Sequence, residues 1–136
     1  PLKFKRVEPT GRAVQCDTMN GNCVLIPNSA AARLGNLDEN FIQQIADIDY
    51  GLRARQAGLK CLVMPGYVGR CEKNPIKNTY NDNSLSVPIK LRLIMAEKGI
   101  PLGPWRLFYK RHGGFFWWAY WLLPYSKVIL SSIFLR

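Results

Sequence analysis

The sequence predicts part of an α/β layer followed by a basic helical extension that is rich in aromatic residues. Apolar runs that end at proline predict two strands, and apolar residues at helical spacing predict a helix between them. Positive charge gathers late in the chain: residues 1–69 hold 8 Lys/Arg against 6 Asp/Glu, and residues 70–136 hold 11 against 3. The second part therefore favours an anionic partner.

The first predicted strand is "CVLIP", residues 23–27, a short apolar run that Pro27 ends. "NSAAARLG" follows and predicts a short helix, with Asn28 or Ser29 as its cap and Gly35 as its stop. We expect Cys23 to be buried in the strand. The same is expected of Cys61. The four cysteines lack the spacing of a zinc module. No disulfide framework is expected either, which indicates a reducing compartment.

A second helix is predicted where Phe41, Ile45, Ile48 and Leu52 recur at steps of four, three and four. It stops at Gly58. "LKCLVMPG", residues 59–66, then predicts the second strand. Two short strands make a poor sheet, so we expect further strands from a missing N-terminal half.

Two carboxylates, Asp47 and Asp49, lie one residue apart in this helix. On a helix they point to nearly opposite sides and cannot share a metal ion, whereas on an extended segment "DID" would be a metal-binding pair. The apolar spacing favours the helix. Asp49 has Arg53 four residues on, which predicts a local salt bridge.

Asp47 has Gly51 at the corresponding position, so no cation is supplied locally. We interpret Gly51 as leaving open space beside the carboxylate, because glycine inside a helix costs about 1 kcal/mol against alanine. Asp47 is then a candidate general base. The alternative is a solvated carboxylate that interacts favourably with the start of the helix.

Residues 20–66, "NGNCVLIP…LGNLDENF…DIDYGLRARQAGLKCLVMPG", resemble the C-terminal half of the catalytic domain in family 2 glycosyltransferases. The resemblance implies the GT-A fold of nucleotide-sugar transferases, with residues 1–72 as the C-terminal half of that domain. The tail from Gly99 to Tyr125 also resembles the basic aromatic extension of some bacterial members, which suggests work on cell-envelope polysaccharide.

The resemblance implies sugar transfer with inversion, in which a carboxylate at the start of the helix takes the proton of the attacking hydroxyl. Asp47 matches that base, although Ala46 stands where the family usually has Glu. Asp49 and Arg53 match the acid and the Arg that follow in the family and are assigned to support, as is Gly51. The residues expected to bind substrate are Asn20, Gly21, Asn22, Asp38, Glu39 and Arg70. For Asp38 and Glu39, helix capping is an alternative.

The implied partners are a nucleoside-diphosphate sugar and a saccharide or lipid-linked saccharide acceptor. A divalent metal, Mg or Mn, is expected for the full-length enzyme, with its ligands mostly outside this chain. The family's Asp-x-Asp and nucleotide-binding strands precede the matching region, and only about twenty residues precede Asn20 here. We therefore expect a fragment that is inactive alone.

After a polar segment at residues 73–85, predicted as a linker or mobile loop, residues 86–136 form the helical extension. "SVPIKLRLIMAEKG" predicts a helix capped by Ser86. Residues 115–134 carry one charge, and their length permits a membrane span, but the Trp and Tyr rings favour a helix in the interface. A helix packed in a core is the remaining alternative.

We expect the chain to be cytoplasmic and peripheral at the inner face of the membrane, held there by anionic lipid. The predicted membrane-surface residues are Arg106, Lys110, Arg111, Trp117, Trp118 and Trp121. A basic aromatic nucleic-acid-binding module or a non-catalytic membrane-surface module is the rival function. The aromatic residues cluster in an almost uncharged run, so we expect no nucleic acid partner.

Overall fold

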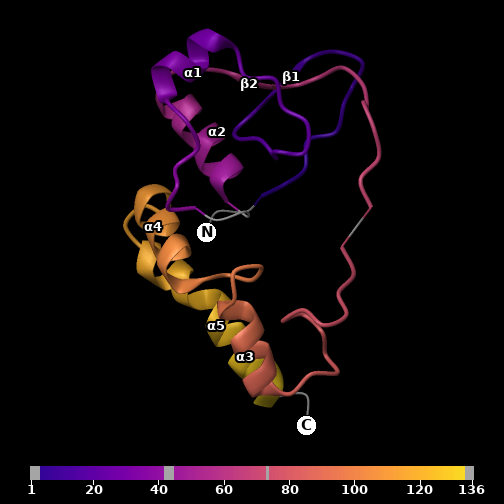
Figure 1. Cartoon of the computed structure of the whole chain (residues 1–136), viewed down its shortest axis with the longest axis vertical. Coiled ribbons are helices and arrows are strands. Elements are labelled where there is room, and N and C mark those ends of the chain that lie inside the picture. Colours follow the sequence, from indigo (N-terminus) through magenta and orange to yellow (C-terminus); the bar gives the residue numbers. More distant parts are fainter. Residues whose placement is uncertain (1–3, 42–44, 73, 134–136) are drawn as a thin grey trace. The chain divides into compact units, whose positions relative to one another are not determined.

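The computed structural model describes residues 4–41, 45–72 and 74–133, and of residues 131–133 only the backbone (Figure 1). The chain forms two compact units. In the described part, one comprises residues 4–72 and the other residues 74–133.

The first unit combines two strands and two helices in the order β1 (Val14–Cys16), α1 (Asn28–Leu34), α2 (Ala46–Gln56) and β2 (Cys61–Val63). The strands pair antiparallel, with Val14 opposite Val63 and Cys16 opposite Cys61. The two helices and the strand predicted after residue 27 are confirmed as α1, α2 and β2. The unit is a small mixed helix and sheet structure, consistent with part of an α/β fold.

The predicted first strand is wrong in position. Residues 24–27 have no regular secondary structure, and Leu25 is 93% exposed. The strand lies instead at Val14–Cys16, where the chain finds β2 as a hydrogen-bonding partner. An apolar run forms a strand only if another strand lies beside it, and the sequence pattern does not show that neighbour. Cys23 is accordingly exposed rather than buried.

Two other cysteines of this unit, one in each strand, are half-buried and face each other across the sheet. Cys16 and Cys61 are paired in register, and both are free thiols. Burial raises the pKa of each thiol. Both groups therefore favour the less reactive thiol form over the thiolate.

The second predicted helix forms as α2, but its buried side differs from the predicted one. Phe41 lies before the helix and Ile45 at its N-cap, both buried, and residues 42–44 lie outside the described part. Ile48 and Leu52 are only half-buried. The buried positions of α2 are Ala46, Asp49, Tyr50, Gly51 and Ala54. Small residues, a tyrosine and a paired acid replace the expected aliphatic face, and at Gly51 the segment of Thr18 and Met19 lies directly on the helix.

The polar segment before the second unit's helices folds into turns organised by Asp82. Its carboxylate accepts hydrogen bonds from the Ser84 hydroxyl at 2.6 Å and from the backbone N–H groups of Asn78 and Ser84 at 2.8 and 2.9 Å. These donors, the Ser84 hydroxyl first, lower the pKa of Asp82 to about 2. The ionised carboxylate is thus the form that accepts these hydrogen bonds and holds the turns together.

The second unit consists of α3 (Val87–Met95), α4 (Leu102–His112) and α5 (Trp117–Ile133), and α5 packs against both of the others. The predicted helix after Ser86 is confirmed as α3. Among the described residues, no helix has both the length and the apolar character needed to cross a membrane. The buried core of the unit is Ile94, Ile100, Tyr125 and Val128, with Tyr80, Leu91, Trp105 and Trp121 packed against it.

Two hydrogen bonds fix the side of α5 that faces this core. The Tyr125 hydroxyl donates to the Ile100 carbonyl oxygen at 2.7 Å, and the Trp121 indole N–H donates to the Leu102 carbonyl oxygen at 3.2 Å. Burial raises the pKa of Tyr125 to about 12. The rotation of α5 about its axis is thus set by polar as well as apolar contacts.

Candidate functional site

Asp47 lies half-buried in the first turn of α2, and each of its carboxylate oxygens accepts one backbone hydrogen bond. Oδ2 accepts from the Gly21 N–H at 2.6 Å, and Oδ1 accepts from the Ile48 N–H at 2.8 Å. A carboxylate offers about four acceptor sites, so each oxygen keeps capacity for another donor. Within the described residues, no cation pairs with Asp47.

The turn at Asn20–Asn22 lies against this carboxylate, although 26 residues separate Gly21 from Asp47. The Asn20 side-chain oxygen accepts a hydrogen bond from the Asn22 N–H at 3.1 Å. A Cβ atom at Gly21 would lie 3.4 Å from both Cβ and Oδ2 of Asp47. The structure thus brings together the predicted base and the three predicted residues of the turn.

Gly51 does not leave open space, and that interpretation was wrong. A Cβ atom at this position would lie 2.5 Å from Oγ1 of Thr18 and 2.8 Å from the backbone nitrogen of Met19. The Thr18 hydroxyl donates a hydrogen bond to the Ile48 carbonyl oxygen at 2.7 Å. Gly51 is therefore needed so that the segment leading into the Asn20–Asn22 turn can lie directly on α2.

We expect Gly51→Ala to destabilise the first unit by about 1–3 kcal/mol, the usual cost of overpacking. The sign of this change in stability is informative, because Gly→Ala inside a helix ordinarily stabilises by about 1 kcal/mol. The measurement is urea denaturation followed by circular dichroism.

Gly103→Ala is the matched control, since Gly103 lies in α4 and an added Cβ meets nothing within 4 Å. It should leave stability unchanged or slightly raised. Equal effects of the two substitutions would contradict the packing role of Gly51.

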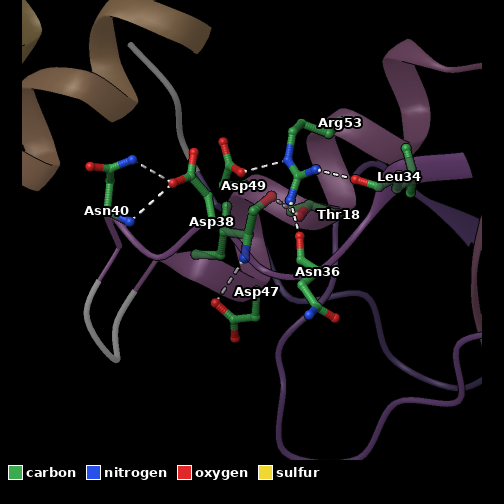
Figure 2. A network of polar contacts seen from close by, with 9 residues as sticks. Thr18, Leu34, Asn36, Asp38, Asn40, Asp47, Asp49 and Arg53 are labelled. Carbon is green, nitrogen blue, oxygen red and sulfur yellow. Dashed lines mark hydrogen bonds and ion pairs between the residues drawn. The ribbon is translucent and has the colours of Figure 1, made fainter. Parts of the chain in front are cut away.

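Asp49 lies on the opposite side of α2 from Asp47 (Figure 2). Its side chain is 0% exposed, and its Oδ2 accepts a hydrogen bond from Nε of Arg53 at 2.8 Å. The predicted salt bridge is confirmed. Because the two carboxylates diverge, the alternative of a shared metal pair is not supported.

The Arg53 guanidinium also holds the end of α1, as Figure 2 shows. Nη1 donates to the Leu34 carbonyl oxygen at 2.9 Å, and Nη2 donates to the Asn36 carbonyl oxygen at 3.0 Å. Leu34 is the last residue of α1, whose carbonyl has no partner within the helix. The Asp49–Arg53 clamp, defined as this ion pair with its two carbonyl acceptors, thus joins α2 to the loop that carries Asp38 and Glu39.

Within that loop, Asp38 is half-buried and Glu39 is exposed. Oδ1 of Asp38 accepts hydrogen bonds from the backbone N–H of Asn40 at 3.0 Å and from its side-chain amide at 2.8 Å. Neither acid caps α2, because the N-cap is Ile45, so that alternative was wrong. Asp38 shapes its own turn instead.

The remaining predicted binding residue, Arg70, is exposed in the irregular segment after β2. Among the described residues, no hydrogen bond or ion pair joins it to Asp47 or to the Asn20–Asn22 turn. The described residues also contain no cluster of His, Cys, Asp and Glu that fits a metal ion.

Sequence reasoning missed Thr18 and the two carbonyl groups of the Asp49–Arg53 clamp. Thr18 lies in a stretch without apolar periodicity, so no local signal marked it. The glycine at position 51 was the available signal, because a mid-helix glycine also permits close approach of another segment.

Comparison with known proteins finds similarity over part of the chain. It is 33% identical over 61 residues to an N-acetylglucosaminyl-diphospho-decaprenol L-rhamnosyltransferase of Mycobacterium tuberculosis strain CDC 1551 / Oshkosh, and equally to that of strain ATCC 25618 / H37Rv. Part of the chain is thus similar to a glycosyltransferase. The match covers 45% of this chain and only 19% of each relative. No family model and no solved structure matches.

Proposed function

We propose that this chain is the C-terminal part of an inverting glycosyltransferase with the GT-A fold of family 2, in which Asp47 is the general base. One observation carries the proposal. Asp47 is an acid without a described cation partner, held by the N–H groups of Gly21 and Ile48 beside a turn of small and amide residues. The partial similarity to rhamnosyltransferases supports the same class of reaction.

In the proposed reaction, an acceptor hydroxyl donates a hydrogen bond to an unused lone pair of Asp47. Its oxygen attacks the anomeric carbon and forms the new glycosidic bond while the bond to the diphosphate oxygen breaks. The hydroxyl proton passes to Asp47, and the electron pair of the broken bond leaves with the nucleoside diphosphate. Attack from the side opposite the leaving group inverts the anomeric carbon.

The structural contribution of this chain is to orient the base. Two fixed N–H donors hold the carboxylate at the start of α2, so it does not have to be ordered when the acceptor binds. The Asn20 and Asn22 side chains offer amide donors and acceptors to a sugar beside it. Asp38 and Glu39 are proposed to contact the acceptor, from the loop that the Asp49–Arg53 clamp tethers.

The proposed donor is a nucleoside-diphosphate sugar and the proposed acceptor a lipid-linked saccharide, by analogy with the name of the relatives. The chain spans about a fifth of their length, so the nucleotide site is proposed to lie upstream in a longer protein. Any divalent cation is proposed to be held there too.

The test is a transfer assay on the full-length encoded protein with radiolabelled nucleoside-diphosphate sugars and a polyprenyl-diphosphate-linked acceptor. We expect one donor to give labelled product, with an anomeric configuration opposite to that of the donor by NMR. The 136-residue chain alone should give none. Absence of product with every donor, or a product with retained configuration, would overturn the proposal.

A further inference from the structure

The exposed residues of α5 outside the stripe that faces the core are largely apolar. Around the helix axis, Trp118, Leu122 and Ile129 lie within about 40° of one another at the edge of that stripe, and Leu123 and Leu130 lie about 120–140° from Trp118. Phe115 is 85% exposed and Trp118 54% exposed. We call this surface, together with the two phenylalanines just before the helix, the outer face of α5; its residues are Phe115, Phe116, Trp118, Leu122, Leu123, Ile129 and Leu130, all exposed.

These residues are exposed although α5 is packed in the core of the second unit. The adjacent stripe of α5 holds Trp121, Tyr125 and Val128, which pack against α3, α4 or the segment between them. A contiguous exposed apolar face on a helix that is already packed marks an interaction surface. The predicted membrane-surface residues divide accordingly: Trp118 is exposed, whereas Trp117 and Trp121 are half-buried in the unit.

The charge of the second unit selects the partner. Residues 73–136 contain ten Lys and Arg against two Asp and Glu. Arg106, Lys110 and Arg111 on α4 and Lys127 on α5 are exposed. Pairing the outer faces of two copies would bring two strongly positive units together, which is unfavourable. An anionic bilayer instead satisfies both the apolar face and the basic residues.

We propose that the outer face of α5 docks this unit on an anionic membrane surface, with α5 lying in the plane of the interface. Phe115, Phe116 and Trp118 enter the headgroup level, where aromatic rings are favoured. Lys110 and Lys127 meet anionic lipid headgroups. The proposal rests on the second unit alone and does not depend on the glycosyltransferase proposal.

The test is co-sedimentation of the 136-residue chain with phosphatidylcholine vesicles, with and without 30 mol% phosphatidylglycerol, as a function of salt. We expect strong binding only to the anionic vesicles and weakening as salt rises. Lys110→Ala and Lys127→Ala should each lower the partition coefficient about fivefold, the equivalent of ~1 kcal/mol per basic residue. Trp118→Ser with Leu122→Ser should lower it at least tenfold.

The matched control is Leu25→Ser with Leu62→Ser, which removes two exposed leucines from the first unit and should leave binding unchanged. Circular dichroism checks that each variant keeps its helices. Equal loss in the control pair, or no binding to anionic vesicles, would overturn the proposal. The proposal would also be overturned if the chain bound a 20-nucleotide single-stranded oligonucleotide as tightly as it binds the anionic vesicles. A dimer in solution that Trp118→Ser with Leu122→Ser abolishes would assign the face to a second copy and overturn it too.

Discussion

Asp47→Asn in the full-length protein is expected to lower kcat for sugar transfer by about 10²- to 10⁴-fold, the range usual for loss of a general base. The amide is almost isosteric with the carboxylate, but it does not take the proton of the acceptor hydroxyl. Its oxygen can still accept from Gly21 or Ile48, so only one of the two hydrogen bonds is lost. We therefore expect only about 1 kcal/mol of destabilisation. KM for the donor should change little.

Asp17→Asn is the matched control for this substitution. Asp17 belongs to the same unit and pairs with Arg55 at 2.7 Å, but the two side chains are 76% and 61% exposed. The kcat of the Asp17→Asn variant should stay within a factor of two of the wild-type value. If Asp47→Asn retains transfer at a comparable level, Asp47 serves only to fix the Asn20–Asn22 turn on α2.

The second large effect is expected from Arg53→Met, which should lower the free energy of unfolding of the first unit by about 3–5 kcal/mol. The substitution leaves the fully buried Asp49 carboxylate without the cation that pairs with it. It also removes the hydrogen bonds to the carbonyl groups of Leu34 and Asn36. Methionine keeps most of the aliphatic volume, so the loss reports mainly on charge and hydrogen bonding.

Arg55→Met, two residues along the same helix, is the comparison for Arg53→Met. Its ion pair with Asp17 is exposed, and exposed pairs contribute about 0–1 kcal/mol. Urea denaturation monitored by circular dichroism measures both variants. Similar losses for the two would show that the Asp49–Arg53 clamp contributes no more than a surface pair. In the full-length enzyme, Arg53→Met should also raise KM for the acceptor if the clamp positions Asp38 and Glu39.

Much of the local structure could be predicted from the sequence because its determinants lie within one turn of a helix. The salt bridge from Asp49 to Arg53 follows from a spacing of four residues. The helices α1 and α3 follow from short patterns that end at Gly35 or begin at Ser86. The opposite directions of Asp47 and Asp49 follow from helix geometry alone (Figure 2).

The parts that could not be predicted depend on segments distant in the sequence. "CVLIP" has the composition of a strand but no described strand beside it, whereas the unremarkable Val14–Cys16 pairs with β2. The role of Gly51 depends on Thr18, and the role of Arg53 depends on carbonyl groups 17 and 19 residues away. No periodic pattern contains such information.

The sequence by itself determined the succession of α1, α2 and β2, the pairing of Asp49 with Arg53 and the concentration of positive charge after residue 70, because composition and short-range spacing encode them. Only the tertiary structure decided that Asp47 receives the Gly21 N–H and that Trp118, rather than Trp117 or Trp121, is exposed on α5. These outcomes depend on which distant segments pack against each helix, and that packing sets which side of the helix remains accessible.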